Sequence, residues 1–193
     1  MLTPGIHDTY ERKARGQRDS GARIAAEGPE PKRTWDGRSR LLEVDGDRFL
    51  SDPSLAEEVF GPSALLVRLS GMDQPPGGSA ARAFRGQLTA VMHIDQTDHD
   101  DARRLLPILE RCTNRIVVNA FSHPQEVGYA TIHGGPFPAT TDSRFTSVGM
   151  TAIDRFLRPV TYQGFPDDLL PDALAGANTD GLWRLVDGEL TRT

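Results

Sequence analysis

The sequence contains a single cysteine, Cys112, among 193 residues. One cysteine cannot form a disulfide within the chain, and this usage is typical of a reducing compartment, so we expect a cytoplasmic protein. Long apolar runs are also missing, so no membrane-spanning helix is expected. The first residues, Met1 to Gly5, lack a charged segment followed by an apolar stretch and therefore do not predict a signal peptide.

An excess of basic residues is absent as well. The chain has 22 lysines and arginines against 27 aspartates and glutamates, which gives a formal net charge of -5. Such a chain offers no broad positive field for a phosphate backbone, so we do not expect nucleic acid as a partner. The dinucleotide fingerprint G-x-G-x-x-G is missing too. The Gly- and Pro-rich stretch 70–78 lacks the Lys-Ser/Thr ending of a phosphate-binding loop and is expected to be a plain connection.

What remains is the composition of an ordinary soluble domain, with 37% hydrophobic and 25% charged residues. Apolar runs and helical periodicity alternate along the chain. The expected strands lie at 40–44, 63–69, 87–94 and 115–119, and the expected helices follow Thr3-Pro4 or lie at 53–58, 80–85 and 98–112. The run 63–69 is almost continuously apolar and predicts a buried strand. A helix between two strands is the pattern of a parallel sheet, so the predicted fold class is α/β.

The last third of the chain has a different character. The stretch 123–144 is irregular, and a short helix with Ile153, Phe156 and Leu157 is expected after it. Residues 158–163 predict an edge strand, because the proline at 159 cannot donate to a ladder. The sequence 182–190 predicts a small hairpin that turns at an Asp-Gly pair.

Cys112 is the one thiol that could act as a nucleophile. It falls at the predicted C-terminal end of a helix, where the negative end of the helix dipole disfavours a thiolate. Catalytic cysteines are favoured by the opposite end of a helix. We therefore interpret Cys112 as a small packing residue.

Four side chains with metal-binding chemistry, His93, Asp95, His99 and Asp101, lie close together in the sequence. They could form a metal site. However, His93 and Asp95 end a predicted strand, and residues 98–101 open a helix, where acidic side chains complement the helix dipole. Capping explains these residues without a metal, and we predict none.

Three further segments have both a chemical and a plain structural interpretation. Residues 57–62 end a predicted helix with two carboxylates, an aromatic ring and a Gly-Pro turn. A carboxylate there could accept hydrogen bonds from sugar hydroxyls, although many such turns only end a helix. His133, beside Gly134-Gly135, is either an exposed loop histidine or a pocket residue. Residues 140–144 form either a ligand-binding segment or a hydrogen-bonded turn.

Three motifs occur in the order found in aldehyde dehydrogenases: EEVFGP at 57–62, VVNAF at 117–121 and HGGPFPATTDSRFTSVG at 133–149. The chain resembles the C-terminal portion of that family. Its ending, FLRPVTYQGFPDDLLP and then GLWRLVDGELTR, resembles the branch that oxidises α-ketoglutarate semialdehyde. The resemblance implies an incomplete Rossmann-like catalytic domain over residues 1–157. It also implies an oligomerisation strand and C-terminal tail over residues 158–193.

The resemblance also implies roles for individual residues. Glu58 matches a glutamate that holds the nicotinamide ribose of NAD or NADP, and Phe60 matches an aromatic packed near the nicotinamide. His133 and Phe137 fall where the family lines its aldehyde tunnel. Asn119 matches an asparagine with a structural role.

The resemblance implies that the catalytic residues lie outside the matched region. In the family, a cysteine thiolate attacks the aldehyde, hydride passes to NAD(P)⁺, and a glutamate activates the water that hydrolyses the thioester. The cysteine, the glutamate base and the nucleotide-binding domain all precede that region, so Cys112 does not replace the nucleophile. We therefore expect part of a semialdehyde dehydrogenase that forms a homo-oligomer or is completed by an N-terminal fragment. The alternative is an inactive fragment that only pairs with a full-length dehydrogenase through 158–163.

Overall fold

The computed structural model describes residues 1–69, 76–123 and 125–192. The chain falls into two compact units, Met1–Arg155 and Phe156–Thr193, each with its own internal contacts. The expected connection 70–78 lies outside the described residues as far as residue 75. Residues 76–78 already belong to helix α3 (Pro76–Ala83), so the helix expected at 80–85 begins and ends earlier than predicted. Within the described ranges, every helix is too short or too polar to cross a membrane.

The first unit begins with helix α1 (Pro4–Asp19), as the Thr3-Pro4 signal predicts. The Thr3 hydroxyl accepts a hydrogen bond from the Ile6 amide at 3.2 Å, and Tyr10 and Ala14 are buried one turn apart. Strand β1 (Arg23–Glu27) follows and was not predicted. All five of its residues are exposed, so it has no apolar alternation, and only its antiparallel pairing with β2 defines it as a strand.

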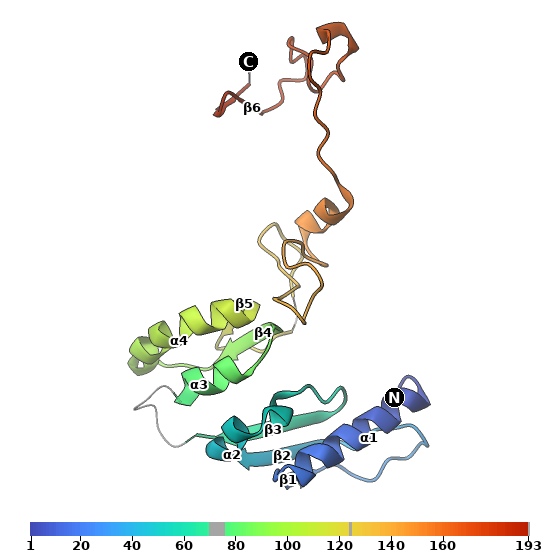
Figure 1. Ribbon diagram of the computed structural model, residues 1–193, viewed down its shortest axis with the longest axis vertical. Coiled ribbons are helices and arrows are strands. Elements are labelled where there is room, and N and C mark those ends of the chain that lie inside the picture. Colours follow the sequence, from blue (N-terminus) through green and yellow to red (C-terminus); the bar gives the residue numbers. More distant parts are fainter. Residues whose placement is uncertain (70–75, 124, 193) are drawn as a thin grey trace. The chain divides into compact units, whose positions relative to one another are not determined.

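The first sheet has the order β1-β2-β3, with β2 (Arg40–Asp45) parallel to β3 (Ser63–Arg68). Helix α2 (Gly46–Ser51) and the 3₁₀ turn η1 (Pro53–Ala56) connect these two strands (Figure 1). The core beside this sheet contains the buried side chains Leu42, Val44, Phe49 and Leu55.

Two predictions in this region are wrong in detail. The helix expected at 53–58 ends at Ala56, because Glu57 adopts an extended backbone, and α2 was not predicted. Strand β3 is not buried. Its residues alternate between half-buried and exposed, with Leu66 41% exposed, because β3 is an edge strand with one uncovered face.

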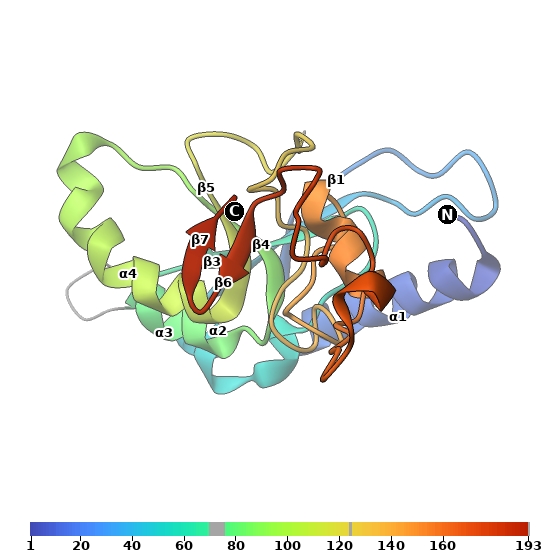
Figure 2. The ribbon, with the colours of Figure 1, turned by 90° about the horizontal axis from the view of Figure 1, so that it is seen from above.

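The second sheet pairs β4 (Gln87–Met92) with β5 (Thr113–Val118) in parallel. Helix α4 (His99–Cys112) joins them and lies beside α3, as Figures 1 and 2 show. The predicted strand–helix–strand unit is therefore confirmed. Asn119 extends the pairing beyond the strand ends, since its side-chain amide exchanges two 2.8 Å hydrogen bonds with the Ile94 backbone. This is the structural role expected for Asn119.

The acidic residues before α4 act as caps, with one difference from the prediction. Asp98 occupies the N-cap position of α4, but its side chain accepts no hydrogen bond from that helix. The Asp98 carboxylate instead accepts a 2.8 Å hydrogen bond from the Asp95 amide and completes a capping box around the 3₁₀ turn η2 (Gln96–Asp98). Asp101 forms an ion pair with Arg104 one turn along the helix.

The chain after Asn119 is mostly irregular. The helix expected around Ile153 is a 3₁₀ turn, η3 (Met150–Phe156), and ends before Leu157. Residues 158–163 form no strand within the described chain; their expected partner is another subunit, so the oligomerisation strand stays a prediction.

The second unit contains the short turn η4 (Asp167–Leu169) and the hairpin of β6 (Arg184–Val186) and β7 (Glu189–Thr191), seen clearly in Figure 2. Asp187 and Gly188 have φ values of 51° and 88°, the left-handed conformations that this tight turn requires. The predicted hairpin is confirmed.

Candidate functional site

The first unit contains a cleft of about 830 Å³. Its walls come from α1, η1 and the chain directly after it, the end of α3, the starts of β4 and β5, and residues of the segments 122–123 and 125–139. Two residues singled out from the sequence, Glu58 and His133, both line this cleft. The fold thus brings together two motifs that are far apart in the sequence.

The Glu58 wall follows the end of η1, where the backbone becomes extended. The Glu58 side chain is exposed, and its carboxylate has no hydrogen-bond or ion-pair partner among the described residues. Its backbone carbonyl, in contrast, accepts a 3.0 Å hydrogen bond from Lys13 Nζ. Lys13 also lies 3.6 Å from a carboxylate oxygen of Glu57. The backbone is therefore tethered while the Glu58 carboxylate stays available for a ligand.

The His133 loop forms another wall of the cleft. The His133 amide donates to Thr146 Oγ1 at 2.8 Å, and the His133 ring nitrogen Nδ1 lies 3.3 Å from Ser147 Oγ. His133 is half-buried. These bonds fix the imidazole at the edge of the cleft rather than leaving it as a free loop side chain.

Glycines allow this loop to approach the second sheet. A Cβ on Gly135 would overlap the Gln87 carbonyl, and a Cβ on Gly86 would overlap the Pro136 carbonyl. The backbone of the His133 loop therefore touches the backbone at the start of β4, next to the residues that line the cleft. This contact explains Gly135, whereas a Cβ on Gly134 would lie 3.3 Å from the Phe145 carbonyl.

The second sheet supplies polar side chains to the cleft. Thr89 on β4 and Arg115 on β5 are register partners, so their side chains share one face of the sheet. Gln87 lies two residues before Thr89 and shares that face. Arg115 Nη1 donates to the Ser122 carbonyl at 2.5 Å, which fixes the guanidinium beside the cleft.

Two other predicted site residues do not line this cleft. Phe60 is 66% exposed and Phe137 is 72% exposed, and their rings lie outside its lining. Glu58, two residues before Phe60, and Pro138, directly after Phe137, do line the cleft. The roles of Phe60 beside a nicotinamide and of Phe137 beside an aldehyde stay predictions.

Cys112 lies away from this cleft. Its sulfur is 3.5 Å from the Ala81 carbonyl, where the end of α4 meets α3. It therefore packs between two helices, as the sequence interpretation proposed. Among residues 1–69, 76–123 and 125–192, no group of three or more His, Cys, Asp and Glu side chains is arranged to hold a metal ion.

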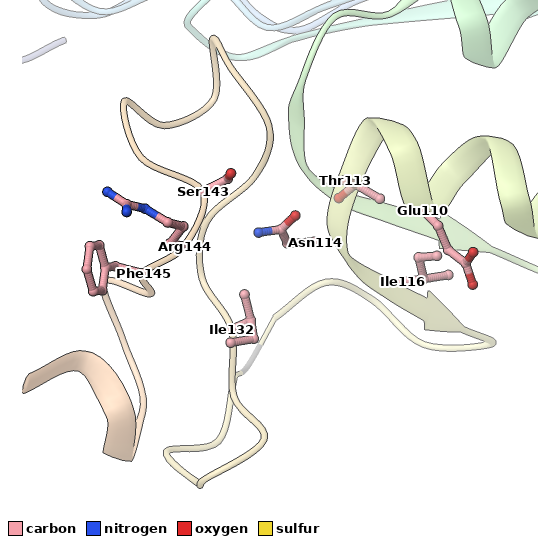
Figure 3. Close-up of a pocket in the computed structure, with 8 residues that line it drawn as sticks. All are labelled: Glu110, Thr113, Asn114, Ile116, Ile132, Ser143, Arg144 and Phe145. Carbon is pink, nitrogen blue, oxygen red and sulfur yellow. The ribbon is translucent and has the colours of Figure 1, made fainter. Parts of the chain in front are cut away.

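A second cavity, of about 410 Å³, lies between the β5 region and the 140–144 segment (Figure 3). Asn114 points toward the loop that carries Ser143. The loop itself is held by its own bonds: Thr140 Oγ1 donates to the Gly135 carbonyl at 2.7 Å, and Arg144 Nη2 donates to Asp142 at 2.6 Å. The hydrogen bonds from Arg144 lower the pKa of Asp142 to about 2. These contacts favour the hydrogen-bonded turn over a ligand-binding segment.

The polar residues of the main cleft that sequence reasoning missed include Lys13, Gln87, Thr89 and Arg115. Three of them carried a usable signal, because polar residues alternated at the start of two strands predicted to be parallel neighbours. Lys13 carried none. Its place depends on the packing of α1 against a segment more than 40 residues away.

Comparisons with known proteins give a consistent result. No protein-family profile matches the sequence. Over 98% of its length, the chain is 46% identical to alpha-ketoglutaric semialdehyde dehydrogenase 2 of Azospirillum brasilense. Over 100% of its length, it is 39% identical to the alpha-ketoglutaric semialdehyde dehydrogenase of Acinetobacter baylyi. The chain spans 36% of the length of each of these curated relatives.

Solved structures agree at the level of the fold. Lactaldehyde dehydrogenase from Escherichia coli matches 82% of this chain and 30% of its own, with a TM-score of 0.61 and 17% identity. Betaine aldehyde dehydrogenase from Staphylococcus aureus, in complex with NAD⁺, matches 86% of this chain and 32% of its own, with a TM-score of 0.57 and 18% identity. At such identities the likeness establishes the fold, and the predicted α/β architecture is confirmed.

Proposed function

The chain belongs to the aldehyde dehydrogenase family, and we propose that it supplies one part of the active site of an NAD(P)-dependent semialdehyde dehydrogenase. Two curated relatives support the family along the whole chain, as the three sequence motifs predicted. The chain spans 36% of their length, so the activity, the substrate and the partner polypeptide are all part of the proposal.

The observation that carries the proposal is that Glu58 and His133 line the same cleft. A carboxylate accepts hydrogen bonds only, and the Glu58 carboxylate is unpaired among the described residues, so it suits the two adjacent hydroxyls of a ribose. The residues present therefore fit a dinucleotide on this side of the cleft. When bound there, the nicotinamide would supply the hydride acceptor for aldehyde oxidation.

The other residues of the cleft orient ligands in this proposal. His133, fixed by Thr146 and Ser147, would line the aldehyde side, and Thr89 and Arg115 would provide polar contacts at the base. The single thiol of the chain, that of Cys112, is not among the described residues that line the cleft. The nucleophilic cysteine and the glutamate base would come from the part of the enzyme that corresponds to the remaining length of the relatives.

The proposed substrate is a semialdehyde that carries a carboxylate. Both curated relatives are named for alpha-ketoglutaric semialdehyde, and we extend that substrate class to this chain. Either NAD or NADP contains the nicotinamide ribose that Glu58 would hold. A cytoplasmic location, expected from the single cysteine, remains part of the proposal.

Reconstitution tests the proposal. The chain would be co-expressed with a polypeptide that corresponds to the preceding part of a related dehydrogenase, and reduction of NAD⁺ or NADP⁺ would be followed at 340 nm, the absorbance of the reduced cofactor. We expect reduction that depends on α-ketoglutarate semialdehyde, is weakened by Glu58→Gln and is unaffected by Glu189→Gln in the hairpin. The chain assayed alone should show no turnover. A folded, co-purifying pair without activity would refute the proposal.

A second candidate function rests on the apolar surface of the second unit. Leu157, Val160 and Leu169 are each more than half exposed in a segment without regular strands. Such a surface suits association with another chain, including a full-length dehydrogenase, without any catalytic role. Size-exclusion chromatography of the chain alone and mixed with a full-length relative separates the two functions. A stable complex that leaves the relative's activity unchanged would favour this candidate.

A further inference from the structure

One face of α1 holds both ends of the segment Glu57–Pro62. Tyr10 and Lys13 are three residues apart on this helix, so their side chains project from the same face. Lys13 contacts the beginning of the segment, and Tyr10 contacts its end. The segment contains Glu58, the carboxylate that lines the cleft.

At the beginning of the segment, Lys13 makes two contacts. Its ammonium donates a 3.0 Å hydrogen bond to the Glu58 carbonyl and lies 3.6 Å from Glu57 Oε2. The Lys13 side chain is 39% exposed and itself lines the cleft. A hydrogen bond from a charged donor to a backbone carbonyl fixes the orientation of that peptide plane. The direction in which the Glu58 side chain leaves the backbone is thereby restricted.

At the end of the segment, the contacts come from Tyr10. Its ring packs where a side chain on Gly61 would lie, and its hydroxyl is 3.4 Å from the Pro62 carbonyl. Tyr10 is fully buried, so this end is anchored by packing. The beginning of the segment lacks such packing, since Glu57 and Glu58 are both exposed. The Glu57 amide donates a 3.3 Å hydrogen bond to the Ser54 carbonyl, and beyond that bond Lys13 is the contact that orders the Glu58 end.

We propose that Lys13 is a positioning residue for Glu58, acting through the Glu58 backbone to present its carboxylate to the cofactor ribose. The inference rests on the proposed function for the part played by Glu58. It goes further in assigning to α1 the task of preorganising the cofactor contact. A preorganised carboxylate binds a ligand more tightly because less conformational freedom is lost on binding.

The first test measures kinetics in the reconstituted enzyme. Lys13→Met removes the charged donor but retains an unbranched side chain of similar length. We expect the KM for the dinucleotide to rise about five- to tenfold while kcat at saturation changes less than about twofold. Lys13→Arg keeps a charged donor and should restore the KM. Lys32 is an exposed lysine between β1 and β2 that does not line the cleft, so Lys32→Met is the matched control and should leave both parameters unchanged.

A double-mutant cycle separates positioning from a general structural role. If Lys13 acts through Glu58, then Lys13→Met should have almost no further effect on the cofactor KM in the Glu58→Gln background. A merely structural role would lower the amount of active enzyme, with an unchanged KM and additive effects. Additive effects, or a KM that does not respond to Lys13→Met, would overturn the inference.

Hydrogen exchange on the chain itself tests the inference if reconstitution gives no activity. Peptides that cover residues 56–60 should exchange about five- to tenfold faster in Lys13→Met than in the unmodified chain, with Lys13→Arg and Lys32→Met unchanged. Peptides from β2 should not change in any variant. If the reconstituted pair is inactive but residues 56–60 exchange faster in Lys13→Met, only the proposed function is refuted. Unaltered exchange in Lys13→Met would refute the role of Lys13.

Discussion

The buried ring of Tyr10 occupies the space in which a side chain on Gly61 would have to lie. The Tyr10 hydroxyl donates to the Arg38 carbonyl, which holds the ring in place, and burial raises the pKa of this phenol. Position 61 thus requires a glycine because the Tyr10 ring leaves no space for a side chain, and not because of its backbone angles. We predict that Gly61→Ala lowers the free energy of unfolding by about 1–3 kcal/mol, because the ring cannot move aside without losing its packing. Urea unfolding followed by circular dichroism measures the change.

Gly16 provides the matched control for this prediction. It lies within α1, and a Cβ there would meet no atom within 4 Å. Gly16→Ala should therefore stabilise the chain by about 0.5–1 kcal/mol through helix propensity alone. If Gly61→Ala behaved like Gly16→Ala, the contact with Tyr10 would not be present in solution.

Arg40 joins α1 to the first sheet. It donates to both carboxylate oxygens of Glu11, at 3.0 and 2.9 Å, and to Glu27 at 3.1 Å, and its side chain is only 13% exposed. The hydrogen bond with Glu11 is the main cause of the raised pKa of Arg40. Arg40→Met would leave the partly buried carboxylate of Glu11 without its cation, whereas Glu27 would keep its 3.2 Å ion pair with Arg38. We predict a loss of about 2–4 kcal/mol in the free energy of unfolding, measured by urea denaturation at pH 7.

The control for Arg40 is an exposed ion pair of the same type. Arg103 pairs with Asp100 on the solvent side of α4, and both side chains are mostly exposed. Arg103→Met should cost at most about 0.5 kcal/mol, because exposed pairs contribute little. Equal losses in the two variants would show that burial of the Arg40 cluster has no energetic consequence.

The parts of the fold that could be predicted from sequence are those with strong local patterns. The unit β4–α4–β5 was predicted because each strand is apolar and α4 carries an apolar face between capping and terminating residues. The hairpin was predicted because an Asp-Gly turn suits φ values above zero. Strand β1 was missed because its residues are all exposed and only its partner, β2, defines it.

The sequence could predict some residues of the site, but not that they line one cleft. Family motifs pointed to Glu58 and His133, yet their place in one cleft depends on backbone contacts such as those of Gly86 and Gly135, which no local pattern encodes. Lys13 could not be predicted for the same reason, since its partner is distant in the sequence. Tertiary packing decides which polar residues share a cleft.

Asn119 allows the cost of a strained backbone to be separated from that of lost hydrogen bonds. Its φ is 54°, and its side-chain amide makes two 2.8 Å bonds with the Ile94 backbone. Asn119→Ala loses both bonds and keeps an unfavourable φ, so we predict a loss of about 2–4 kcal/mol in the free energy of unfolding. Asn119→Gly loses the bonds but tolerates the φ, and the loss should be about 1 kcal/mol smaller. Identical losses in thermal unfolding would mean that the backbone strain is absent.

The pair of Asp142 and Arg144 predicts an effect of pH. Hydrogen bonds from Arg144 lower the pKa of Asp142 from 3.8 to about 2, so folding favours the ionised carboxylate. A group whose pKa is lowered by folding contributes stability above its unfolded pKa and loses it as the pH falls through the folded value. The contribution of this turn should therefore be complete above about pH 4 and lost as the pH falls through about 2.

Carboxyl NMR measures this pKa directly. In the unmodified chain, the Asp142 carboxyl should titrate with a midpoint of about 2, and Arg144→Gln should return it toward 3.8. Arg103→Gln removes a guanidinium from the surface of α4 and should leave the Asp142 midpoint unchanged. The pairing would be disproved by an Asp142 midpoint that stays near 2 in Arg144→Gln, because another group would then have to stabilise the carboxylate.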